Sequence, residues 1–147
     1  MQAKSVLQFL GYEVSLLRFE KRDAVNKRDF QVTPMFKREI ATLPDDCYDV
    51  TLGIIIRGTD ENPIPFELCV ELTGHFKATF VNESEQTKKQ LTTQNTVAIL
   101  FPFLRSTVAS LTLAANIPPV LLPVINLAGA FEKNEAHLDD GDNNITE

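Results

Sequence analysis

The chain has 147 residues, a length that suits one domain with a single buried core. Its net charge is −6, of which residues 132–147 carry −5 and residues 1–131 only −1, so the body lacks the basic field of a nucleic-acid-binding surface. Two cysteines, Cys47 and Cys69, stand outside any paired motif, which argues against a disulfide scaffold. We expect one domain over residues 1–131 and an acidic, disordered tail over residues 132–147.

Four segments that alternate apolar and polar residues predict β-strands in the first half of the chain. They cover about residues 8–21, 30–41, 48–57 and 66–80. The first segment changes phase between Leu16 and Leu17, which predicts a β-bulge there. Such alternation is typical of an antiparallel sheet that is buried on one face.

Helices are predicted after residue 80. Ser84 is a candidate cap for a short polar helix, and Asn95 or Thr96 for a long one. In the long helix, apolar residues recur at spacings of three and four, a stripe that can cover one face of a sheet. The members of this stripe are Val97, Phe101, Leu104, Val108, Leu111 and Ala115. Strands followed by helices predict an α+β fold.

The segment from residue 95 to residue 131 is unusually apolar, with 37 residues and one formal charge, Arg105. Polar residues and prolines divide it, so it contains no clean run of the roughly 20 apolar residues that a membrane-spanning helix needs. The first residues do not resemble a signal peptide. We therefore expect a soluble cytoplasmic protein with no membrane insertion.

The long helix also lacks the charged outer face of a helix that covers a sheet in a monomer. Its second side carries no charge and consists of Leu100, Phe103, Thr107, Ser110, Leu113 and Ala114. We predict that a partner subunit covers this side.

Residues 117–126 (IPPVLLPVIN) form an apolar segment that contains three prolines. Proline removes backbone donors and favours extended geometry, which predicts a stiff connector. Two interpretations stay open for this loop. It packs over the core of its own domain, or it forms one wall of an apolar groove for extended peptide.

Catalytic motifs are not found in the sequence. Its six glycines form no phosphate-binding loop, and no serine lies in a nucleophile elbow. Cys69 and His75 share a strand face but are six residues apart, about 20 Å along a strand, which is too far to share a metal ion. We expect no enzymatic activity, no metal site and no cofactor.

Several motifs resemble the SecB family of protein-export chaperones. They are residues 45–50 (DDCYDV), 66–76 (FELCVELTGHF) and 99–105 (ILFPFLR), followed by prolines at 118 and 119 and by residues 123–127 (PVINL). The similarity covers about residues 8–131, with the elements in the same order.

The resemblance implies a four-stranded antiparallel sheet with a long and a shorter helix packed on one face. It also implies an ATP-independent holdase that binds unfolded polypeptides, such as preproteins for export, and that assembles as a homotetramer, a dimer of dimers. The implied peptide-binding residues are Met35, Phe36, Val120, Leu121, Leu122, Val124 and Ile125. The implied subunit-interface residues are Leu100, Phe103, Thr107, Ser110 and Leu113.

Members of this family pass clients to the SecA motor through acidic residues on the exposed sheet and, often, through a zinc-binding tail. Glu20 matches one acidic position, whereas Leu16 occupies the other. The tail has no cysteine and only His137, so it cannot form the usual zinc site. Glu20 is therefore the candidate SecA contact. The alternative is a dedicated adaptor for one partner, such as an antitoxin, without SecA coupling.

Overall fold

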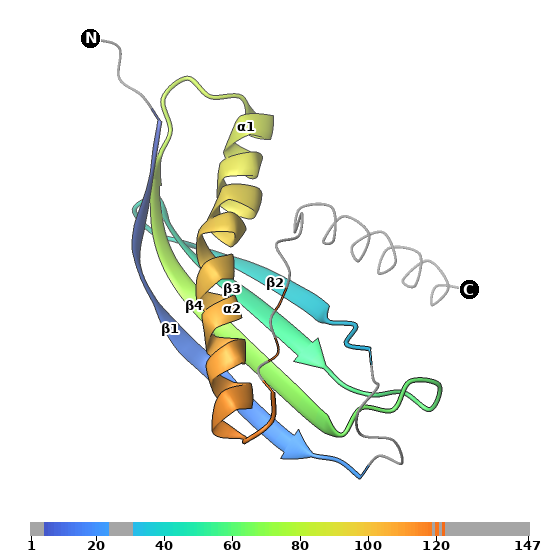
Figure 1. The fold of residues 1–147 in the computed structure, drawn as a ribbon. Coiled ribbons are helices and arrows are strands. Elements are labelled where there is room, and N and C mark those ends of the chain that lie inside the picture. Colours follow the sequence, from blue (N-terminus) through green and yellow to red (C-terminus); the bar gives the residue numbers. More distant parts are fainter. Residues whose placement is uncertain (1–4, 24–30, 119, 121, 123–147) are drawn as a thin grey trace.

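A computed structural model describes residues 5–23, 31–118, 120 and 122 of the chain. Its antiparallel sheet comprises β1 (Val6–Lys21), β2 (Met35–Leu43), β3 (Cys47–Ile56) and β4 (Phe66–Thr79), in the spatial order β1-β4-β3-β2 (Figure 1). A long helical segment crosses one face of this sheet. The predicted α+β fold is confirmed. The expected boundary between domain and tail lies outside the described residues.

The core lies between the helix and the two central strands. Alternate side chains of β3 and β4 point to this face, and cross-strand neighbours such as Leu52 and Leu72 lie in register. The fully buried members are Val50, Leu52, Ile54 and Ile56 of β3 and Leu68, Val70, Leu72 and Phe76 of β4. The alternation read from the sequence therefore identifies the buried face.

Strand β1 contains two irregularities in its pairing with β4. The register shifts between Phe9 and Gly11 and again between Val14 and Leu16, and Gly11 has a φ of 119°. The second shift confirms the predicted bulge. It lies one residue earlier than expected, so Leu16 pairs with Glu71 on the face away from the helix.

Strand β2 begins at Met35, five residues later than the pattern predicted. Pro34, immediately before it, has no backbone N–H to donate to a sheet. Across the turn that follows β2, Asp45 and Asp46 have φ values of 62° and 58°. Aspartate tolerates this left-handed region, in agreement with their predicted role as turn residues.

The helical segment consists of α1 (Glu85–Gln90), one turn of π-helix (Leu91–Asn95) and α2 (Thr96–Ala114). Ser84 caps α1 as predicted, because its hydroxyl accepts a hydrogen bond from the Thr87 N–H at 3.1 Å. The predicted cap at Asn95 or Thr96 is wrong. The helix runs on through the π-turn, where Asn95 has helical dihedrals and makes no side-chain cap.

Residues Glu85–Ala114 together span 30 residues and are apolar enough, by length and composition alone, to cross a membrane. In the structure α2 packs on β3 and β4. Its side chains Val97, Leu100, Leu104 and Val108 are at most 2% exposed. The helix thus has the packing of one that covers a sheet.

Candidate functional site

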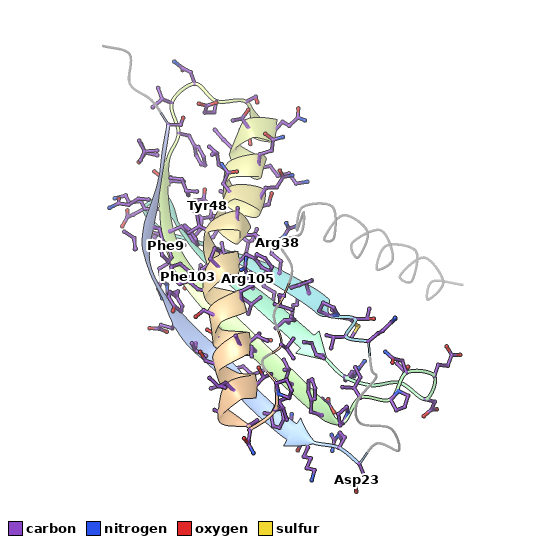
Figure 2. The ribbon with its side chains drawn as sticks, viewed as in Figure 1. Phe9, Asp23, Arg38, Tyr48, Phe103 and Arg105 are labelled. Carbon is purple, nitrogen blue, oxygen red and sulfur yellow. The ribbon has the colours of Figure 1, made fainter. Side chains whose placement is uncertain are left out.

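Helix α2 presents an outer side with almost no charge. Arg105 is the one charged residue of Thr96–Ala114 in the sequence, and the structure places it on the exposed side of the helix. Figure 2 shows Arg105 on α2 away from β1, and Phe103 on the β1 side. Other exposed positions of this helix are Ala98, Pro102, Ser106, Ser110, Leu113 and Ala114.

Aromatic contacts join α2 to the edge strand β1. The ring of Phe103 lies 4.6 Å from that of Tyr12 and 5.8 Å from that of Phe9, centroid to centroid. Tyr12 remains 38% exposed, and Leu113 at the end of α2 is 64% exposed. The apolar surface therefore continues from the helix onto the edge strand.

Strand β1 is itself unusually apolar for an edge. Within the described part of the chain it pairs with β4 on one side, and no strand pairs with its other side. Its large exposed apolar side chains are Val6, Leu10, Tyr12, Val14, Leu16 and Leu17. A long apolar edge of this kind is open to pairing with another chain.

One of the predicted interface residues belongs to the core instead. Leu100 is 0% exposed and lies against Gly74 of β4, where a Cβ atom would come within 2.6 Å of Leu100 Cδ2. Within this chain Leu100 is therefore a core residue with no exposed surface for a partner to cover. Phe103 and Thr107 are half-buried, and Ser110 and Leu113 are exposed, so these four residues stay available to a partner.

The chain leaves α2 in a Schellman motif. Asn116 has a φ of 61°, its N–H donates to the Leu113 carbonyl at 3.0 Å, and the Ile117 N–H donates to the Thr112 carbonyl at 3.2 Å. These bonds satisfy carbonyls at the helix end that would otherwise lack partners. They also set the direction in which the proline-rich loop departs.

The loop then returns over α2. The Val120 N–H donates to the Thr112 hydroxyl at 3.0 Å, and the Leu122 side chain, 5% exposed, joins the core. Val120 is half-buried and packs against the same core. This packing is the first of the two interpretations that the sequence left open for the loop.

A pocket nevertheless remains between the loop and the exposed side of α2. It has a volume of about 380 Å³ and is lined by Pro102, Arg105, Ser106, Ala109 and Leu122. Leu122 thus contributes both to the core and to the wall of a surface pocket. Leu121, Val124 and Ile125, which were predicted to line the groove, lie outside the described residues.

The two predicted groove residues of β2 lie on opposite faces of the sheet, because neighbouring side chains of a strand alternate. Phe36 faces the helix, with its ring 6.2 Å from that of Phe101. Met35 pairs with Ile55 on the other face and is 44% exposed. A groove beside the loop can include Phe36 but not Met35.

Arg38 shares the helix-facing side of β2 with Phe36. Its Nη1 donates to the Thr93 carbonyl at 3.1 Å, within the π-helical turn. Figure 2 shows Arg38 on β2 on the side of the helical segment. The arginine ties the edge strand to the helix at the point where the helical hydrogen-bond pattern changes.

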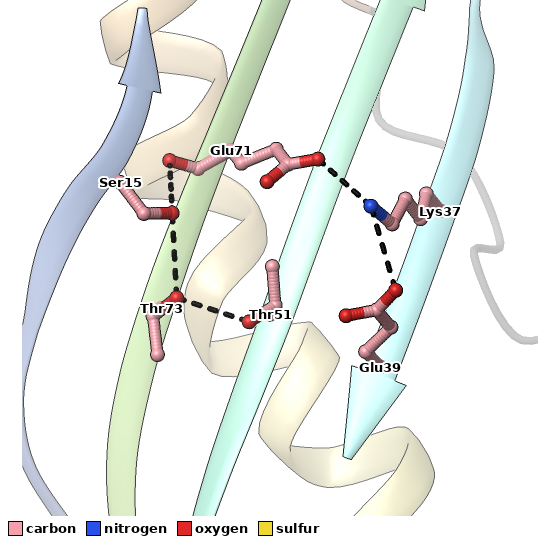
Figure 3. Close-up of polar contacts among 6 residues, drawn as sticks. All are labelled: Ser15, Lys37, Glu39, Thr51, Glu71 and Thr73. Atoms are coloured by element: carbon pink, nitrogen blue, oxygen red, sulfur yellow. Dashed lines mark hydrogen bonds and ion pairs between the residues drawn. The ribbon is translucent and has the colours of Figure 1, made fainter. Parts of the chain in front are cut away.

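The opposite face of the sheet is polar. Lys37 Nζ of β2 reaches across β3 to Glu71 of β4 at 2.9 Å and to Glu39 at 3.4 Å, while the hydroxyls of Thr51 and Thr73 lie 3.0 Å apart (Figure 3). Gly53 lies beneath the Lys37–Glu71 pair, and a Cβ there would stand 3.2 Å from Glu71 Cγ. The missing side chain leaves the ion pair room to span two strands.

Glu20, the candidate SecA contact, lies in a mixed-charge cluster. Its carboxylate is 2.7 Å from Arg22 and 3.7 Å from Arg18, and Arg22 also reaches Glu67 at 2.8 Å. The Arg22 hydrogen bond lowers the pKa of Glu67, and the same bond raises the pKa of Arg22. The cluster is therefore not a simple acidic patch.

The described residues show no constellation suited to catalysis or to metal binding. His75 Nδ1 lies 2.7 Å from Asp49, an ordinary pair on the polar face of the sheet. Burial raises the pKa of the Cys69 thiol, which disfavours a reactive thiolate. No group of three or more metal-ligating side chains occurs among the residues that the structure describes.

Two features of the site escaped the sequence reading. Thr112 was not considered, although it lies four residues after Val108 and so on the buried stripe of the helix. The contribution of β1 to the apolar surface was also missed, because its side chains read as an ordinary half-buried strand. The position of Thr112 and the exposed apolar side chains of β1 become informative only when the tertiary contacts of the helix and the strand are known.

Comparisons with known proteins agree with the fold. A family model described as preprotein translocase subunit SecB matches residues 13–137. A protein-export protein SecB of Anaplasma phagocytophilum is 35% identical over 97 residues, 65% of this chain and 61% of the relative. An uncharacterized protein of Methanocaldococcus jannaschii is 45% identical over 71 residues, 48% of this chain. The chain spans 44% of the archaeal relative's length.

A solved structure supports the same architecture. It contains the SecB-like chaperone Rv1957 of Mycobacterium tuberculosis in complex with a ChAD peptide from the antitoxin HigA1. The two chains superpose with a TM-score of 0.66, over 81% of this chain and 90% of the other, at 14% sequence identity. At this identity the similarity concerns the fold.

Proposed function

This chain belongs to the SecB family, and from that premise we propose that it is a chaperone that binds unfolded polypeptides without ATP. The observation that carries the proposal is the pocket between α2 and Leu122, on a helix side whose one charge is Arg105. Preproteins awaiting export are the proposed clients, and the cytoplasm is the proposed location. The role of a holdase requires no catalytic residue.

Weak apolar contacts repeated along a surface suit such a role. Each square ångström of apolar area removed from water contributes about 25 cal/mol, whatever the client sequence. Several short contacts on one client add up through multivalency. A surface that runs from the pocket along the loop side of α2 therefore binds many unfolded chains with little selectivity. Among the residues that the structure describes, we assign Phe36, Val120 and Leu122 to this client-binding surface.

A charge placed in the pocket tests this proposal. Ser106 is exposed at the pocket, so Ser106→Asp leaves the core intact but forces clients to bury a carboxylate. We expect client affinity to fall by roughly tenfold, since an apolar client would have to strip water from the added carboxylate. Aggregation of several unrelated unfolded proteins, with and without the variant, is the measurement. Leu122→Asp is a poorer test because Leu122 is 5% exposed and supports the core.

Gln86→Asp on α1 is the matched control, since it adds the same charge at an exposed helical position away from the pocket. Equal capture by Ser106→Asp and the unaltered protein would remove the pocket from the client site. Protection of one co-purifying partner, with no effect on unrelated proteins, would favour the adaptor alternative. The antitoxin peptide bound by the mycobacterial protein makes such a partner a reasonable second candidate.

The surroundings of Glu20 do not favour binding of SecA. Glu20 is paired with Arg22 at 2.7 Å, so a basic partner would have to compete with an ion pair that is already formed. Neighbouring Arg18 adds a further positive charge to this part of the sheet.

A further inference from the structure

We propose that Thr112 is a positioning residue that holds the loop wall of the client pocket in place before a client binds. The inference rests on the proposed function. It concerns the buried hydroxyl at the end of α2 and the loop amide that it binds.

Thr112 is 0% exposed, and its Oγ1 lies 3.0 Å from the carbonyls of Val108 and Ala109. A hydroxyl has one proton and two lone pairs. The hydroxyl therefore donates its proton to the helix carbonyls, and its oxygen can still accept a hydrogen bond. The Val120 N–H, 3.0 Å away, donates that bond. Thr112 thus joins the helix to a segment eight residues later.

The sequence explains why this bond falls at Val120. Pro118 and Pro119 have no backbone N–H, so Val120 is the first residue after Ile117 that can donate a backbone hydrogen bond. Ile117 is already bound to the Thr112 carbonyl at 3.2 Å. One residue of α2 therefore accepts the two backbone donors that flank the proline pair.

The anchor controls the pocket through Leu122. Leu122 lies two residues beyond Val120 and is both buried in the core and part of the pocket lining. Two prolines stiffen the approach to Val120, and the bond to Thr112 then fixes the backbone two residues before Leu122. A loop that is already ordered binds an extended client without the loss of conformational entropy that ordering the loop would require.

Two substitutions at Thr112 separate the hydroxyl from the shape of the side chain. Thr112→Val keeps the branched shape and removes the acceptor, which leaves the Val120 N–H unpaired. Thr112→Ser keeps the acceptor and removes a methyl group. We expect Thr112→Val to weaken client binding by roughly tenfold and to speed hydrogen exchange at Val120 by a similar factor. We expect Thr112→Ser to stay close to the unaltered protein in both measurements.

The full chain is used, with one unfolded test protein as client and thermal unfolding as the check on folding. Faster Val120 exchange with unchanged client affinity in Thr112→Val would overturn the inference and leave the proposed function standing. Equal losses in the serine and valine variants would also overturn it, because packing would then explain both. If Thr112→Val fails to fold, hydrogen exchange at Val120 in the unaltered protein replaces it: a slow amide before client is added supports the inference, and an amide that exchanges as fast as an unstructured one overturns it. If the unaltered protein captures no client, the proposed function itself fails.

Discussion

At the scale of single residues, charge pairs on the exposed sheet set local proton affinities. Arg22 donates to Glu67 at 2.8 Å, and this bond lowers the pKa of Glu67 from its ordinary value of 4.5. A carboxyl whose pKa is depressed by folding contributes stability above its unfolded pKa and loses it as pH falls through the folded value. The contribution of the Arg22–Glu67 bond to stability is therefore lost as pH falls through the folded pKa of Glu67.

We expect Arg22→Gln to raise the pKa of Glu67 toward 4.5, as measured by NMR titration of its side-chain carboxyl. The free energy of unfolding at acid pH should then depend less on the protonation of Glu67. Lys21→Gln, which removes an exposed positive charge one residue away, is the control. If the pKa of Glu67 changed equally in both variants, the loss of any nearby positive charge, and not the loss of the Arg22 hydrogen bond, would explain the change.

At the scale of elements, glycine governs how closely α2 approaches β4. A Cβ at Gly74 would come within 2.6 Å of Leu100 Cδ2 and 2.8 Å of the Phe76 ring. Each contact is too short for any real Cβ, and the neighbours are packed in the core. The helix can therefore lie at its observed height only because this strand position has no side chain.

We expect Gly74→Ala to destabilise the fold by about 1–3 kcal/mol, the usual cost of overpacking a core. Denaturant unfolding measures this loss. Gly53→Ala is the matched control in the neighbouring strand, because its new Cβ would meet a flexible Glu71 side chain at 3.2 Å. A larger loss at Gly53 than at Gly74 would contradict this account of helix packing.

At the scale of the whole molecule, exposed apolar surface on β1 and α2 predicts assembly. Leu113 is 64% exposed and Leu17 is 54% exposed, values more typical of polar residues. Surfaces of this kind are normally covered by a partner. A second copy that pairs with the open edge of β1 would cover it, and a dimer of such dimers remains the proposed assembly.

We expect Leu113→Asp to dissociate the assembly, because a buried interface would then have to bury an unpaired charge. Light scattering should report a smaller mass for the variant, with an unchanged far-UV spectrum. Thr59→Asp, an exposed substitution in the loop between β3 and β4 and outside β1 and α2, is the control. A monomeric mass for the unaltered protein would refute the prediction of assembly.

The sequence predicted the elements well and the helix contacts less well. Alternation in β3 and β4 identified the buried face, because a strand's period of two is local. Leu100 was assigned to the outer side because the apolar stripe was read too narrowly. In the structure the core side of α2 is wide enough to include Leu100, which occupies the space above Gly74. That contact joins residues 26 positions apart in the chain, and no local pattern reports it.

The sequence by itself determined the α+β fold, the strand positions to within a few residues, and an apolar late segment with one charge. These features follow from periodicity and composition, which depend on short stretches of sequence and not on contacts with distant residues. Only the tertiary structure decided that Met35 and Phe36 face opposite ways across the sheet, that Leu122 serves both core and pocket, and that Thr112 anchors Val120. Those facts depend on which residues meet in space, and chain folding alone brings them together.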